Sequence, residues 1–132
     1  MKASLCRFRR NEAGAAAVEF ALVIIPFLTL LFGIAWLAVI LHTNSALHWA
    51  VEHAARSAAM NNAVTQSQIS TEINGYLGTL GISSATVSYS VAAGALPVAH
   101  ITATLSKTYA LPLVPHVQIN YVADTYVPQA GP

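Results

Sequence analysis

The sequence predicts an α+β fold in which one long helix carries a small sheet domain. Three observations support this prediction. An apolar run without charge covers residues 20–41, a helical pattern continues beyond it to about residue 60, and the hydrophobic period changes from helical to alternating near residue 86. We therefore expect a basic leader at 1–14, a long helix at 15–62 with a membrane-spanning half at about 20–41, and a small extracytoplasmic α+β head at 63–132.

The apolar run from Phe20 to Leu41 has 22 residues, of which fifteen are Leu, Ile, Phe or Val. A helix of that length spans roughly 33 Å, enough to cross a hydrocarbon core of about 30 Å. The fifteen side chains favour insertion by roughly 5 to 9 kcal/mol on the translocon scale. The sequence therefore predicts a membrane helix. Pro26 removes one backbone hydrogen bond, and Gly33 loosens the helix further, so both are predicted kink positions.

Charge predicts how this helix is oriented. Four basic residues against Glu12 give +3 before the apolar run, whereas the chain after Leu41 carries −1. Because basic segments stay in the cytoplasm, we expect a cytoplasmic N-terminus and an extracytoplasmic head. The total charge of +1 leaves no electrostatic footprint for nucleic acid. A conventional cleaved signal peptide fits less well, because its apolar core would be about 7–15 residues long.

The spacing of apolar residues predicts the second half of the long helix and the elements of the head. Leu47, Val51, Ala54 and Ala58 form an apolar stripe at helical spacing, and the alanines allow close approach of another element. Asn61-Asn62 ends the helix. Beyond it we expect a second helix at about Ser67–Leu77 with Leu80 on its apolar face, then strands at Thr86–Val91, Ala99–Ser106 and Val117–Ala123, and a frayed tail from Pro128 to Pro132.

Catalytic and metal-binding patterns are weak. His48, Glu52 and His53 do not match the His-Glu-x-x-His spacing, so we expect a solvated polar face, with Glu52 and Arg56 as an exposed pair, and no metal or other cofactor. The tryptophans, Trp36 and Trp49, are expected at the membrane interface. Paired-carboxylate catalysis has no supporting pattern, and the protein is not expected to be an enzyme.

Glu19 is the residue that most needs an explanation. A carboxylate at the rim of a lipid-embedded helix is costly and is functional by default. It either sits at headgroup level or pairs with an opposite charge. If the leader were removed after Gly14, the new amine of Ala15 would stand four residues before Glu19. Two subunits with a small axial offset could then pair the amine of one with the Glu19 carboxylate of the other.

The stretch Gly14-Ala15-Ala16-Ala17-Val18-Glu19-Phe20-Ala21-Leu22 resembles the prepilin signals of tight-adherence (Flp) pili. In that pattern a glycine precedes the cleavage point, glutamate is fifth in the mature chain and an aromatic residue is sixth, the places that Ala15, Glu19 and Phe20 occupy. The longer stretch, through Pro26 and Gly33 to Ala54-Ala55-Arg56-Ser57-Ala58-Ala59, is similar to the TadE-like family of minor pseudopilins. Ser57 and Ala58 stand where that family often has a glycine after the arginine.

The resemblance implies a pilin-like lollipop, cleavage by a prepilin peptidase, and partnership with other pilin or pseudopilin subunits. The expected function is therefore assembly or priming of an adhesive pilus, with Gly14 and Ala15 at the cleavage point and Glu19 and Phe20 in subunit assembly. The alternative is an uncleaved, single-pass anchor that carries an extracytoplasmic binding module. A membrane-anchored enzyme is the third possibility, and it would need a pocket with converging polar groups in the head.

Overall fold

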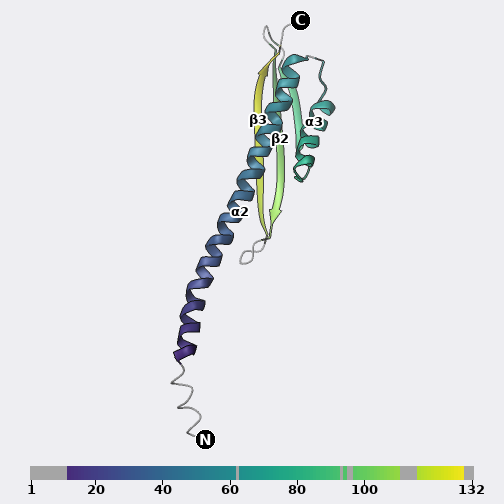
Figure 1. Cartoon of the computed structure of the whole chain (residues 1–132). Coiled ribbons are helices and arrows are strands. Elements are labelled where there is room, and N and C mark those ends of the chain that lie inside the picture. Colours follow the sequence, from purple (N-terminus) through teal and green to yellow (C-terminus); the bar gives the residue numbers. More distant parts are fainter. Residues whose placement is uncertain (1–11, 62, 93, 95–96, 111–115, 130–132) are drawn as a thin grey trace, which may run out of the picture. The chain divides into compact units, whose positions relative to one another are not determined.

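The computed structural model describes residues 12–61, 63–92, 94, 97–110 and 116–129, with side chains from Gly14 onward. In chain order the elements are α2 (Glu12–Met60), α3 (Gln66–Thr79), β1 (Thr86–Ala92), β2 (Val98–Tyr109) and β3 (Val117–Pro128), as Figure 1 shows. The three strands form one antiparallel sheet in the order β1-β2-β3. The α+β fold with a long helix, a short helix and a three-stranded antiparallel sheet is thus confirmed. Most of the expected leader, and the tail at 130–132, lie outside the described residues.

The chain divides into two compact units, Met1–Ile40 and Leu41–Pro132. In the first unit, the described residues are the N-terminal half of α2. This helix begins at Glu12, earlier than the expected residue 15, and the whole helix ends at Met60 rather than 62. It stays α-helical through Pro26 and Gly33. The Thr29 hydroxyl donates to the Ile25 carbonyl at 2.8 Å in the turn that follows the proline.

In the second unit, the apolar stripe of α2 forms one wall of the core. Leu47, Val51, Ala54 and Ala58 are all at most 1% exposed, as the periodicity predicts. This half of α2 packs on the sheet, as Figure 1 shows. The buried residues of β2 include Ala99, Ile101, Ala103 and Leu105. Burial of small side chains on both sides explains how a sheet of only three strands obtains a closed hydrophobic core.

Helix α3 is defined by caps at both ends. At its start, the Thr65 hydroxyl accepts from the Gln68 N–H, and the Gln68 side chain accepts from the Thr65 N–H, forming a capping box. At its end Gly81 takes φ 69°, and the Ile82 N–H reaches back to the Leu77 carbonyl at 3.0 Å. Ile69, Ile73 and Leu77 are buried as expected. Leu80 is 40% exposed, because the chain turns there and carries it off the apolar face.

Strands β2 and β3 are longer than the alternating pattern indicates. They pair over their full length, from Val98 opposite Pro128 to Tyr109 opposite Val117. The sequence pattern underestimates β2 because Lys107 falls on the inner face, where its amine lies 5.6 Å from the centre of the Tyr109 ring. The expected fraying of the tail is wrong at Gln129. Its N–H donates to the Pro97 carbonyl at 2.9 Å, and its side chain is buried.

Candidate functional site

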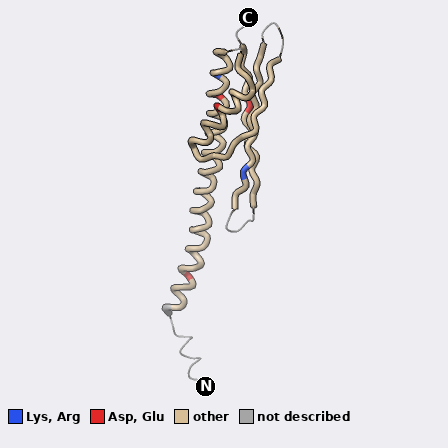
Figure 2. The backbone as a smooth tube through the Cα atoms, turned by 90° about the vertical axis from the view of Figure 1, so that its right-hand side faces the viewer, with Lys and Arg blue, Asp and Glu red and all other residues tan. Residues whose placement is uncertain are grey.

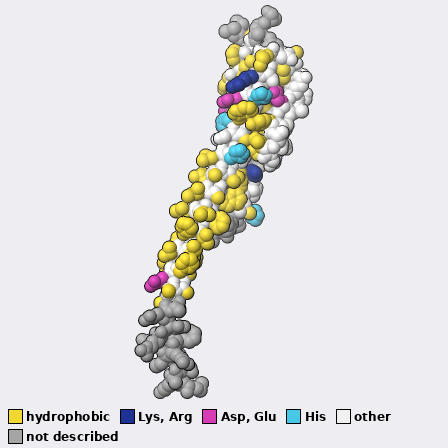
Figure 3. All heavy atoms as spheres, in the orientation of Figure 1, with side chains coloured by type: hydrophobic (Ala, Val, Ile, Leu, Met, Phe, Trp, Pro, Cys, Tyr) yellow, Lys and Arg dark blue, Asp and Glu magenta, His cyan; other side chains and the backbone are white. Residues whose placement is uncertain are grey.

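The N-terminal half of α2 exposes an apolar surface that nothing in the described structure covers. Leu22 is 72% exposed and Phe20 68%, and other large apolar side chains follow them to Leu41. Figure 3 shows hydrophobic side chains covering this part of the helix. Such a continuous patch marks a lipid or protein interface in a stable protein. The described helix Gly14–Met60 is long and apolar enough to cross a membrane, which is consistent with a membrane anchor or a signal.

Glu19 lies within this apolar surface. From Gly14 to Val51 it is the only Asp, Glu, Lys or Arg, and its neighbours Val18 and Phe20 are exposed beside it. Among the described residues, the single ion pair of the chain joins other residues, so the Glu19 carboxylate has no cationic partner there. The described residues supply no opposite charge for this carboxylate. If Glu19 is buried in lipid or protein, the opposite charge must come from another molecule or from outside the described residues.

The Gly14–Ala15 junction lies near the beginning of α2. A Cβ at Gly14 would meet no atom within 4 Å, and Gly33 is equally open. Neither glycine is therefore required by close packing in the described structure. The junction lies two residues after Glu12, the first described residue of the helix.

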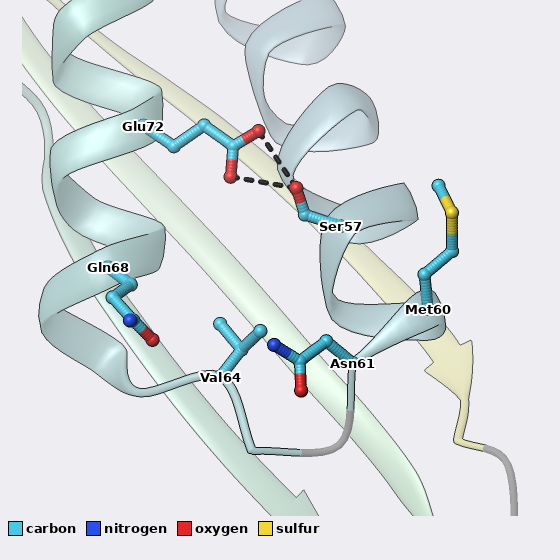
Figure 4. A pocket seen from close by; sticks show the side chains of 6 residues that line it. All are labelled: Ser57, Met60, Asn61, Val64, Gln68 and Glu72. Carbon is cyan, nitrogen blue, oxygen red and sulfur yellow. Dashed lines mark hydrogen bonds between the residues drawn. The ribbon is translucent and has the colours of Figure 1, made fainter.

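A second group of residues joins α2 to α3 in the head. The Ser57 hydroxyl on α2 lies 2.9 Å from both carboxylate oxygens of Glu72 on α3, as Figure 4 shows. His53, one turn before Ser57, places its Nε2 atom 3.7 Å from the same carboxylate. Ser57 occupies the position where a glycine was expected from the family pattern. Its hydroxyl gives this departure a structural role, because it ties the long helix to α3.

The structure corrects the predicted Glu52–Arg56 pair and gives Trp49 contacts in the head. Within the described part of the chain, the ion pair is His53–Glu72, and none joins Glu52 to Arg56. The Trp49 ring stacks on His53, with centroids 5.6 Å apart, and on Tyr76, with centroids 4.9 Å apart. Trp49 therefore helps to attach α3 to α2. Periodicity of α2 alone could not reveal this, because the contact depends on where α3 packs.

The head otherwise carries little chemistry. Figure 2 shows how few charged residues lie along the described backbone. Among the residues described with side chains, no group of three His, Cys, Asp or Glu is placed to hold a metal ion. The hollow beside Glu72 is lined by Ser57, Met60, Asn61, Val64, Gln68 and Glu72. Figure 4 shows it at the turn between the two helices, and its single acid is engaged by Ser57.

Two buried tyrosines hydrogen-bond to each other across β2 and β3. The hydroxyls of Tyr109 and Tyr121 are 2.9 Å apart, and each residue is 4% exposed. Burial, followed by the hydrogen bond to Tyr109 and the charge of that neighbour, raises the pKa of Tyr121 well above its ordinary value of 10.0. Tyr121 therefore keeps its proton in the folded head under conditions in which an unfolded tyrosine ionises.

This tyrosine pair predicts alkaline destabilisation of the head. Below about pH 10 Tyr121 is neutral in both states, so its contribution to stability is complete. As the pH rises above 10, the unfolded chain releases the proton and the folded chain keeps it, so the free energy of unfolding falls. We expect the thermal midpoint of the full chain in detergent, followed by near-ultraviolet circular dichroism, to decline above pH 10. Tyr121→Phe should flatten this decline; an equally steep decline in that variant would contradict the assignment.

Comparison with known families gives one match. The family model described as TadE-like protein matches residues 14–56, which includes the exposed half of α2 and the Ala-Ala-Arg block. No curated protein and no solved structure matches the chain significantly. The match ends before α3 and the sheet, so nothing in the comparisons bears on the partner of the head.

Proposed function

We propose that this chain, whose residues 14–56 match the TadE-like family model, is a minor pseudopilin of a tight-adherence pilus. The family is pilin-like and generally non-enzymatic. The observation that carries the proposal is the exposed, apolar N-terminal half of α2 with one carboxylate, Glu19, five residues after Gly14. This surface would contact three partners: the bacterial inner membrane, a prepilin peptidase, and other pilin or pseudopilin subunits.

The first step is removal of the leader. Cleavage of the peptide bond after Gly14 frees the amine of Ala15 and removes the basic segment that holds the N-terminus in the cytoplasm. The new terminus is positively charged and is also the positive end of the helix dipole. It thus becomes a cationic site within one helical turn of the Glu19 carboxylate.

The second step is pairing between subunits. In the same chain, the amine and Glu19 are four residues apart, roughly 6 Å along the helix axis. An adjacent parallel helix displaced along its axis by about this distance brings its Glu19 level with the amine. Opposite charges 4 Å apart attract by about 1 kcal/mol in water and about 4 kcal/mol at an effective dielectric constant of 20. A mis-registered neighbour leaves both charges unpaired in an apolar setting, so the pair selects one stagger.

The experiment that tests the proposal is intact-mass analysis of the chain produced with and without its prepilin peptidase. We expect the mass to fall by that of Met1–Gly14 only when the active peptidase is present. A catalytically inactive peptidase is the matched control. An intact leader in cells that make the pilus would instead favour the uncleaved anchor that carries an extracytoplasmic binding module.

A further inference from the structure

The two edges of the sheet differ in how their backbone groups are satisfied. At the β1 edge, α3 supplies side chains as caps. The Gln66 amide donates to the Val87 carbonyl at 3.2 Å. Just before the strand, the Asn74 amide accepts from the Ala85 N–H at 2.7 Å and donates to the Ala85 carbonyl at 3.3 Å. Helix α3 therefore covers part of one edge and blocks the addition of another strand there.

At the β3 edge, the register identifies which backbone groups point away from the sheet. The Gln129 N–H donates to the Pro97 carbonyl, so residue 129 faces β2. In an antiparallel strand, the backbone N–H and C=O groups of consecutive residues point to opposite sides of the strand. The N–H and C=O groups of the odd-numbered residues of β3 therefore point toward β2. The N–H and C=O groups of the even-numbered residues therefore point to the free edge: Gln118, Asn120, Val122, Asp124 and Tyr126. The same parity places the Val87 carbonyl outward on β1, where Gln66 caps it.

The free edge lacks the devices that usually protect an edge strand. Among the described residues, no side-chain hydrogen bond reaches the backbone of Val117–Pro128. The strand pairs continuously over its twelve residues without a bulge, it carries no lysine or arginine, and its only proline, Pro128, is the last residue. Its exposed side chains include Val122, which is 51% exposed, and Tyr126, which is 66% exposed. A long, nearly uncharged, uncapped edge of this kind is a template for strand pairing.

We infer that β3 is a docking edge that takes up an extended segment of another polypeptide as a fourth, antiparallel strand. The outward N–H and C=O groups of β3 hydrogen-bond to the added strand. The exposed side chains of Val122 and Tyr126 favour apolar side chains at the positions of the added strand that lie opposite them. Asp124, the one charge of β3, favours a basic residue across from it. The inference does not depend on the pilus assignment, since it rests on the sheet alone.

Amide hydrogen exchange in the full chain tests this edge. In detergent micelles, we expect alternating protection along β3, with slow exchange at odd-numbered residues and fast exchange at even-numbered ones. The probe is a synthetic peptide with the sequence of β2, Val98–Tyr109, that carries Thr102→Lys and Thr104→Val. In the register of β2 these two residues lie opposite Asp124 and Val122. Adding the peptide should slow the exchange of the Asn120, Val122 and Asp124 amides at least tenfold. Slow exchange of the even-numbered amides without peptide would overturn the inference, and so would fast exchange of these amides in its presence.

Two methylated peptides provide a matched control that leaves the protein unchanged. In the register that β2 itself uses, the backbone N–H groups of peptide positions 102, 104 and 106 face the free edge, whereas those of positions 103 and 105 face away. Methylation of the first three backbone nitrogens should abolish protection, and methylation of the other two should leave it intact. Equal effects of the two peptides would contradict strand addition. In the protein, Val122→Pro removes an outward N–H and should weaken binding at least tenfold, while Val122→Thr should bind as the unmodified chain does.

Discussion

Replacement of Glu19 by glutamine is expected to abolish pilus assembly and to leave the protein in the membrane. The substitution keeps the size of the side chain and removes its charge, so each subunit contact loses roughly 1 to 4 kcal/mol of attraction. Each subunit addition should therefore weaken by about fivefold to about a thousandfold. The apolar run that inserts the helix is unchanged, so membrane fractionation should be normal, while the yield of sheared pili should fall to background.

The control for this prediction is Glu52→Gln. Glu52 is also an acid on α2, but it lies in the second unit, exposed and outside any ion pair among the described residues. Its replacement should leave pilus yield unchanged. A normal yield with Glu19→Gln would remove the pairing hypothesis and leave Glu19 as a headgroup-level residue.

Replacement of Gly14 by valine is expected to leave the leader attached. Gly14 is exposed and a Cβ there meets no atom within 4 Å, so the helix itself tolerates the larger side chain. Loss of processing would then report recognition by the peptidase rather than misfolding. Intact-mass analysis in the presence of the peptidase should find only the full-length chain, and no Ala15 amine would be available for pairing.

Gly33→Ala is the matched control, because Gly33 lies in the same helix and is equally open to a Cβ. That variant should be processed like the natural chain. Efficient removal of Met1–Gly14 from Gly14→Val would contradict the assigned cleavage point, and loss of processing in both variants would indicate a general effect on the helix.

Much of the architecture was predictable because periodicity reports burial directly. The stripe containing Leu47 and Val51, the face of α3 with Ile69 and Ile73, and the alternation along β2 all follow from one local repeat. Strand ends were less predictable. The extension of β3 to Pro128 depends on pairing with Val98, a residue thirty positions earlier, and the Lys107 position breaks the apolar alternation that would reveal the end of β2.

Some residues of the candidate site were likewise predictable from the sequence, and others were not. Glu19 and Gly14 stand out in the sequence because a charge and a glycine interrupt an apolar pattern. The Ser57–Glu72 contact gives no such signal, since the two residues are fifteen positions apart and meet only when α3 packs on α2. The stacking of Trp49 gives no signal for the same reason, because its partner Tyr76 belongs to another helix. Contacts between elements are set by packing, which no local pattern contains.

The pairing of a freed terminus with Glu19 can be measured directly by zero-length coupling. Assembled material from mixed ¹⁴N- and ¹⁵N-labelled subunits would be treated with an apolar carbodiimide, digested and examined by mass spectrometry. We predict an amide between the Ala15 amine of one subunit and the Glu19 carboxylate of a differently labelled one. A chain that begins at Met1, or a coupling found only within single subunits, would contradict the account.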